Sequence, residues 1–203
     1  MSTLTRSLLS RRFNGFARAL RRCERGVAAV EFGLLAPLLL LMFIGTVEIS
    51  RAIEMDRRFA QVTAMVGDLV AREKTITNAD LDKVFDIAQL VMSPYDSTQL
   101  NLSVVSVKAS STSATNTKVE WAYPFHSGAN YAQCAAYTLS TGLVSKGGSV
   151  IVVESNYKWQ PLFGSFIPGM HANMTWTDKT TNSPRNSCVD KLATNCVLAC
   201  AGF

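Results

Sequence analysis

The sequence has few of the residues and motifs on which common enzymes depend. Its 203 residues include only two histidines, His126 and His171. It contains no G-x-S-x-G, no H-E-x-x-H and no glycine-rich loop of the kind that cradles phosphate. A catalytic triad would need one of the two histidines beside a serine that no motif singles out. The sequence therefore predicts no catalytic residues, no metal and no cofactor, and favours a protein that is not an enzyme.

Charge is missing from one long stretch of the chain. Residues 32–47, FGLLAPLLLLMFIGTV, carry no charged side chain. Extended to residues 27–49, this run would span about 34 Å as a helix with a rise of about 1.5 Å per residue. That length is enough to cross a bilayer core of about 30 Å. The sequence therefore predicts a transmembrane helix at residues 27–49.

Acidic residues are almost absent from the N-terminus, where the positive charge gathers. Residues 1–26 contain seven arginines and one glutamate, a net charge of +6, so residues 27–203 of this +5 chain carry −1. An arginine-rich run just before an apolar segment usually sets membrane topology rather than binding nucleic acid. The pattern predicts a basic cytoplasmic leader at residues 1–26, with all residues after 49 outside the cytoplasm and no nucleic-acid partner.

Cysteines are few, and most of them follow the apolar run. The four that do are Cys134, Cys188, Cys196 and Cys200. In an oxidising compartment four cysteines predict two disulfides, and three pairings are possible. Zinc binding by the last three is the alternative, but their spacing matches no common zinc motif. We therefore expect two disulfides, with the pairing left open.

Proline is absent from residues 38–74, so the helix is predicted to continue beyond the membrane. Residues 50–74 carry apolar side chains mostly at intervals of three or four, which is typical of an amphipathic helix. The predicted apolar face consists of Ile49, Ile53, Phe59, Val62, Val66 and Leu69. This half of the helix is expected to pack on the outer domain.

Residues 75–203 are predicted to form a small extracytoplasmic α+β domain. Thr77 and Asp80 form a capping-box pattern, opening a helix that stops before Pro94. Its apolar face is Leu81, Val84, Phe85, Ala88 and Met92. The period then changes to two in four segments, which predicts an antiparallel sheet with one buried face. These segments are residues 100–104, 119–123, 149–159 and 170–176.

A charged residue lies close to the start of the apolar run. Gly26 ends the basic leader, four small apolar residues follow, and Glu31 and Phe32 come next. A carboxylate inside a membrane helix costs about 2.5 kcal/mol or more, so it needs a partner or a place near the interface. Cleavage after Gly26 would create an ammonium group on Val27, one helical turn from Glu31. The ammonium of one molecule could also pair with Glu31 of the next.

This region resembles the N-terminal signature of the TadE/TadG-like pseudopilins of the Flp/Tad (tight adherence) branch of type IV prepilins. The resemblance covers RGVAAVEFGLLAPLLLLMFIGTVEISRA, in which Glu31, Pro37 and the exit Glu48–Ala52 occur together. A weaker likeness covers Val152–Glu154 with Tyr157, and the Pro161–Gly164 run. The length of the chain makes TadE-like proteins the nearer fit.

The resemblance implies a pilin-like fold and a minor pseudopilin of an Flp/Tad pilus. Gly26 would be the last leader residue, Val27 the new N-terminus, and Glu31 with Phe32 the recognition and assembly residues. Major Flp pilins are very short and carry tyrosine where this chain has Phe32, which favours an accessory subunit. The implied partners are the lipid bilayer, a prepilin peptidase, other pilins and the assembly machinery. The implied location is the bacterial inner membrane with a periplasmic domain, or a cell-surface pilus.

Plainer interpretations remain open for the same residues. Glu31 could lie at the membrane interface, where a helix N-terminus favours negative charge. Pro37 is predicted to kink the helix, but the kink could be passive. Cleavage after Ser50-Arg51-Ala52 by an ordinary signal peptidase would release a soluble protein. The alternative function is a membrane-tethered envelope binding domain with an uncleaved anchor, outside any pilus.

Overall fold

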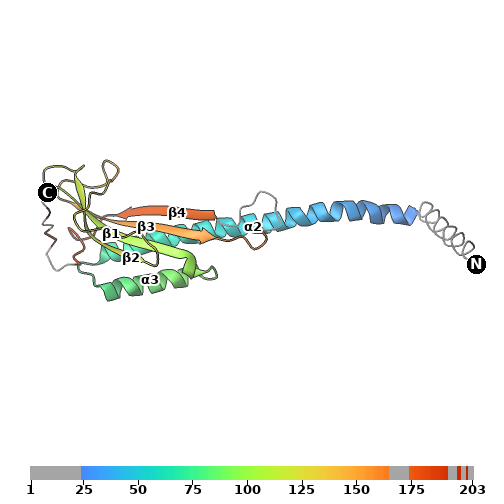
Figure 1. Cartoon of the computed structure of the whole chain (residues 1–203), viewed down its shortest axis with the longest axis horizontal. Helices are drawn as coiled ribbons and strands as arrows, with labels where there is room; N and C mark the ends of the chain where they lie inside the picture. Colours follow the sequence, from blue (N-terminus) through green and yellow to red (C-terminus); the bar gives the residue numbers. More distant parts are fainter. Residues whose placement is uncertain (1–23, 165–173, 192–195, 198–199, 201–203) are drawn as a thin grey trace, which may run out of the picture. The chain divides into compact units, whose positions relative to one another are not determined.

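The computed structural model describes residues 24–164, 174–191, 196, 197 and 200 (Figure 1). The chain divides into two compact units, Met1–Ile49 and Ser50–Phe203. The elements are α2 (Glu24–Arg72), α3 (Asn78–Met92), the 3₁₀ turn η1 (Ser97–Gln99), β1 (Leu100–Ala109), β2 (Thr117–Phe125), β3 (Ser149–Trp159) and β4 (Met174–Asn182). Most of the predicted leader, residues 1–23, lies outside the described residues.

Helix α2 is one continuous helix of 49 residues that contains Pro37. Its part within the second unit buries one stripe of side chains: Met55, Phe59, Val62, Val66, Val70 and Ala71. The predicted apolar face was therefore partly wrong. Ile49 and Ile53 are about half exposed, and Val70 rather than Leu69 is fully buried. Met55 is the first fully buried residue of the stripe, and Ala52 before it packs against the same core but is only partly buried.

Helix α3 begins and ends where the sequence predicted. The hydroxyl of Thr77 accepts a hydrogen bond from the Asp80 backbone N–H at 3.3 Å, and the Asp80 carboxylate accepts one from the Thr77 N–H at 3.2 Å. This reciprocal pair is a capping box. These bonds from Thr77 lower the pKa of Asp80. The helix buries Leu81, Phe85, Ala88 and Met92 and ends just before Ser93 and Pro94.

The four strands form one antiparallel sheet in the order β2-β1-β3-β4. Strand β3 has the bounds that its alternation and β-branched run predicted. The last strand extends further than predicted: β4 is described from Met174 to Asn182, whereas the prediction ended at residue 176, and Met170 and Ala172 lie outside the described residues. The second half of β4 was not predicted, because its residues are polar and show no hydrophobic alternation.

The two helices pack on one face of the sheet. Phe59 and Phe85 join the core with side chains of β1 and β3, and Thr63 forms a buried hydrogen bond of 2.7 Å with Ser155. Helix α2 approaches β4 so closely that a Cβ atom on Gly67 would lie 2.5 Å from the Asn182 side chain. Any larger residue at this position would have to displace the Asn182 side chain, which glycine avoids.

The opposite face of the sheet is also buried, which the prediction of one buried face did not anticipate. The loop between β2 and β3 packs Tyr137 on this face, with Leu139 and Val144 partly buried beside it. The covered sheet residues are Val105, Val107, Val119, Val150 and Val152. Valines therefore occupy both sides of β1 and β3. The predicted fold class is confirmed: a long apolar N-terminal helix, a small antiparallel sheet and two disulfides form an α+β protein.

Candidate functional site

The predicted recognition motif lies near the start of α2. Gly26, Val27, Glu31 and Phe32 all fall within this helix, and the side chains of Val27 and Phe32 are 58% and 69% exposed. Val27 and Glu31 are four residues apart, so a helix places them on the same face about 6 Å apart along its axis. The structure thus brings together the two positions whose charges were predicted to pair.

Glu31 is exposed and has no hydrogen bond or ion pair with any residue that the structure describes. Its helical neighbours are mostly exposed apolar side chains, including Val30 and Leu34. A carboxylate in such surroundings is stable only if water, a lipid headgroup or an external cation reaches it. The described part of the chain provides no partner, so any partner must come from outside it.

Gly26 has no packing reason to be glycine. A Cβ atom built on it would meet nothing within 4 Å, and its φ angle lies in the ordinary range. Glycine inside a helix costs about 1 kcal/mol relative to alanine. Gly33 and Gly45 have equally open surroundings, in contrast to Gly67. The described fold therefore gains nothing from glycine at position 26.

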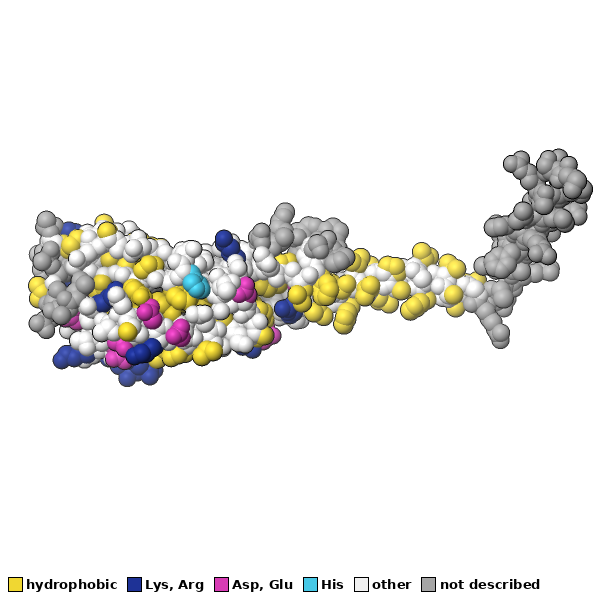
Figure 2. Space-filling view, turned by 60° about the horizontal axis from the view of Figure 1, so that its bottom comes forward, with side chains coloured by type: hydrophobic (Ala, Val, Ile, Leu, Met, Phe, Trp, Pro, Cys, Tyr) yellow, Lys and Arg dark blue, Asp and Glu magenta, His cyan; other side chains and the backbone are white. Residues whose placement is uncertain are grey.

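The helix that follows the motif is a candidate membrane anchor. Figure 2 shows mainly hydrophobic side chains along this part of the helix. None of its most apolar 18-residue window is buried. Pro37 is exposed within the helix, and it cannot donate a backbone hydrogen bond to the carbonyl of Gly33. Exposed apolar side chains in this number need a non-aqueous surrounding.

The four predicted cysteines form two pairs in the second unit. Cys134 pairs with Cys200, with Cα atoms 5.6 Å apart, and Cys188 pairs with Cys196, with Cα atoms 6.2 Å apart. Both distances lie in the normal range for disulfides. The pairing settles the choice that the sequence left open. No group of three or more potential metal ligands occurs among the described residues, and the cysteines considered for zinc are used in disulfides.

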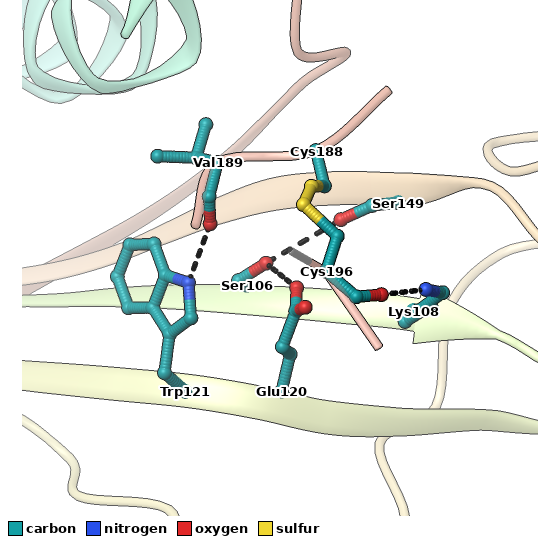
Figure 3. The surroundings of a disulfide bond; sticks show 8 residues. All are labelled: Ser106, Lys108, Glu120, Trp121, Ser149, Cys188, Val189 and Cys196. Carbon is teal, nitrogen blue, oxygen red and sulfur yellow. Dashed lines mark hydrogen bonds between the residues drawn. A yellow bond between two sulfur atoms is a disulfide. The ribbon is translucent and has the colours of Figure 1, made fainter. Parts of the chain in front are cut away.

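A buried carboxylate beside the second disulfide was missed by sequence reasoning (Figure 3). Glu120 is only 2% exposed; it accepts a hydrogen bond of 2.9 Å from Ser106, and its Oε1 atom has no hydrogen-bond partner among the described residues. In the predicted strand at residues 119–123, Val119 and Trp121 face the core, which would place Glu120 on the solvent side. The β1–β2 register shifts at this point, so Glu120 is the extra residue of a bulge and turns inward. Burial raises the pKa of Glu120, and the charge of Asp190 adds to this, whereas Ser106 and Lys108 oppose it.

A second polar cluster lies on the loop-covered face of the sheet. Glu154 accepts hydrogen bonds from Tyr131 and Tyr137, and its carboxylate lies 3.3 Å from the Lys179 ammonium. Burial would raise the pKa of Glu154, but these three donors outweigh it and lower the pKa. The hydrogen bond to Glu154 raises the pKa of Tyr131 to about 12. A hollow of about 390 Å³ opens beside Glu154, but this carboxylate already has three donors.

These features define a class of protein: an α+β protein whose long apolar helix, a candidate membrane anchor, precedes a small disulfide-bonded unit. The model of the family described as TadE-like protein matches residues 26–67. The resemblance of the N-terminal segment to TadE-like proteins is therefore confirmed. The matched segment begins at Gly26 and ends within the buried part of α2. No curated protein and no solved structure matches the chain significantly.

Proposed function

We propose that this protein is a minor pseudopilin of an Flp/Tad-type pilus. In this proposal a prepilin peptidase removes residues 1–26, and the mature protein supports pilus assembly, anchoring or surface adherence. Its role is structural, without catalysis. The basic leader remains in the cytoplasm, and the disulfide-bonded unit lies in the periplasm.

The observation that carries the proposal is the unpartnered carboxylate of Glu31. Within the described chain nothing neutralises it, although exposed apolar side chains surround it. Cleavage after Gly26 would supply an ammonium group at Val27, one turn away on the same face. Between two molecules the same pairing would fix the register of neighbouring helices, since the apolar side chains around it are interchangeable in lipid.

Gly26 supports the cleavage position independently. Glycine at position 26 lowers the stability of the helix, and no close packing contact compensates for this loss. A peptidase that must fit a small residue at the cleavage site would explain it. The TadE-like match also starts at Gly26, the last residue of the proposed leader.

N-terminal sequencing of the protein from its native membranes is the direct test. A mature chain that starts at Val27 is expected. An intact Met1 would instead favour the alternative, a membrane-tethered envelope binding domain outside any pilus. A chain starting at Ile53 would indicate cleavage by signal peptidase and a secreted protein.

Two matched variant pairs separate processing from assembly. Gly26→Arg should leave the leader in place, whereas Gly26→Ala, which stays small, should still be cleaved; the gel mobility of each reports this. Glu31→Gln keeps the size of the side chain and removes its charge, so it should be processed yet fail to support pilus assembly. Normal piliation of the Glu31→Gln strain would contradict the proposed pairing with Val27.

A further inference from the structure

Exposed apolar side chains in the unit Ser50–Phe203 are unevenly distributed. The large ones among the described residues are Ile53, Ile87, Leu90, Leu143, Leu162, Phe163, Met174 and Val197. Five of them belong to one end of the unit, which we call the proximal end because it contains Ser50. These five are Ile53, Leu90, Leu162, Phe163 and Met174.

Hydrogen bonds place the end of α3 at the proximal end. Arg58 donates to the Ser93 carbonyl at 2.6 Å, and the Tyr95 hydroxyl donates to the Arg51 carbonyl at 3.2 Å. These contacts hold the C-terminus of α3 beside the first turns of α2 in this unit. Leu90, which is 75% exposed, lies in that last turn of α3.

The end of β3 and the start of β4 lie at the same place. Arg51 and Gln160 line one hollow, and Met174 pairs directly with Trp159. Leu162 and Phe163 come two and three residues after Gln160, so they lie close to this hollow. Four separate segments therefore contribute their exposed apolar side chains to the proximal end: α2, the end of α3, the chain after β3 and the start of β4.

Aromatic side chains accompany these apolar residues. The rings of Trp159 and Trp176 stack with their centroids 6.2 Å apart, and Tyr95 lies against Arg51. Tryptophan and tyrosine are enriched where a protein meets the membrane–water interface, because their rings are apolar with one polar group. The third tryptophan, Trp121, lies elsewhere, bonded to the Val189 carbonyl.

Connectivity brings the proximal end to the membrane. Ser50 directly follows residue 49, the last residue of the transmembrane helix predicted from the sequence, and α2 is unbroken at this junction. The charged side chains here nearly balance: Arg51, Arg57, Arg58 and Lys158 stand against Glu54, Asp56 and Asp96. Contact with a bilayer would therefore depend on apolar burial rather than on attraction to anionic lipid.

We infer that the proximal end of this unit docks into the interface of the membrane that anchors the chain. Leu90, Leu162, Phe163 and Met174 insert beside the headgroups, with Trp176 at their level. The inference rests on the proposed membrane anchor. Docking would hold the disulfide-bonded unit against the bilayer until the protein leaves the membrane.

Tryptophan fluorescence of the full chain in phosphatidylcholine vesicles with brominated acyl chains tests this docking. Trp176 pairs with Tyr157, which pairs with Leu100, whereas Trp121 pairs with Ser106. The six steps along β1 from Leu100 to Ser106 separate the two tryptophans by about 20 Å, at about 3.3 Å per residue. A chain that retains only Trp176 should lose half or more of its emission relative to unbrominated vesicles. A chain that retains only Trp121 should lose almost none.

Surface variants keep the test independent of folding. Leu90→Ser combined with Leu162→Ser should restore most of the Trp176 emission, while Leu143→Ser, at an exposed position outside the proximal end, should not. Adding phosphatidylglycerol should leave the quenching unchanged. Quenching that appears only with this anionic lipid would overturn the apolar mechanism.

The outcomes also separate this inference from the proposed function. Retention of the chain in vesicles after an alkaline carbonate wash, with Trp176 unquenched, would overturn the docking and leave the anchor intact. Release of the chain by the same wash would overturn the membrane anchor, and with it both proposals.

Discussion

The two parts of helix α2 have similar backbones and opposite surroundings. From residue 27 to residue 43 most large apolar side chains are exposed, whereas from Met55 to Ala71 a stripe of them is buried. Phe43 and Phe59 illustrate the contrast, with exposed fractions of 67% and 2%. The first part must find an apolar surrounding outside the chain, while the second helps to form the core of its own unit. Helix formation alone therefore does not decide whether apolar side chains are buried within the protein or need an apolar surrounding outside it.

The largest effect is expected from a substitution in the core that the second part of α2 helps to form. Phe59→Ala should lower the free energy of unfolding of the disulfide-bonded unit by roughly 3–5 kcal/mol, because it leaves a cavity beneath the sheet. Phe43→Ala removes the same ring from the exposed part and should leave that stability unchanged. Denaturant unfolding of the full chain in detergent micelles measures both. Equal losses in the two variants would contradict the contrast.

The disulfides sharpen the comparison, because both lie in the unit Ser50–Phe203. The Cys134–Cys200 bond spans 66 residues and the Cys188–Cys196 bond spans 8. By chain entropy, replacing the first pair with serine should destabilise this unit by about 4 kcal/mol and replacing the second by about 2.5 kcal/mol. The melting temperatures of the two double variants, measured by thermal unfolding, show which disulfide contributes more to stability. The reverse order would show that strain or local packing, rather than loop length, sets their effects.

A charged substitution in the exposed first part of α2 tests whether this part lies in lipid. Leu39→Lys places an ammonium near the centre of the candidate span and should weaken membrane insertion by about 3 kcal/mol. Gln61→Lys adds the same charge at an exposed position of the second part and should have no effect on insertion. The fraction of chain resistant to carbonate extraction reports the difference. If Leu39→Lys inserted as well as the parent, the span would lie elsewhere.

The smallest expected effect concerns the buried carboxylate of Glu120. Because burial raises its pKa above the ordinary 4.5, the folded protein holds this proton to higher pH than the unfolded chain does. Its contribution to stability is therefore fully present below pH 4.5 and is lost as pH rises through the raised pKa. Glu120→Gln should raise the melting temperature by a few degrees at neutral pH and change it little at acidic pH. An equal effect at both pH values would mean that ionisation of Glu120 is not responsible.

Prediction from sequence succeeded where the signal was local. The capping box at Thr77 and Asp80, the end of α3 before Pro94 and the bounds of β3 each depend on a few adjacent residues. It failed where a long-range contact decided the outcome. Ile53 fits the helical period of an apolar face but is half exposed, although the neighbouring Ala52 packs against the core. Glu120 turns inward only because of a bulge against β1.

The sequence by itself determined the uncharged run, the basic leader, the Gly26–Phe32 motif and the presence of four cysteines after the apolar segment. These are properties of composition and spacing, which no folding can alter. Only the tertiary structure decided which cysteines pair, which side of the second part of α2 is buried, and that the loop between β2 and β3 covers the second face of the sheet. It also gathered exposed apolar side chains from four segments at the proximal end. Each of these depends on residues that are far apart in the chain and meet only when the sheet forms.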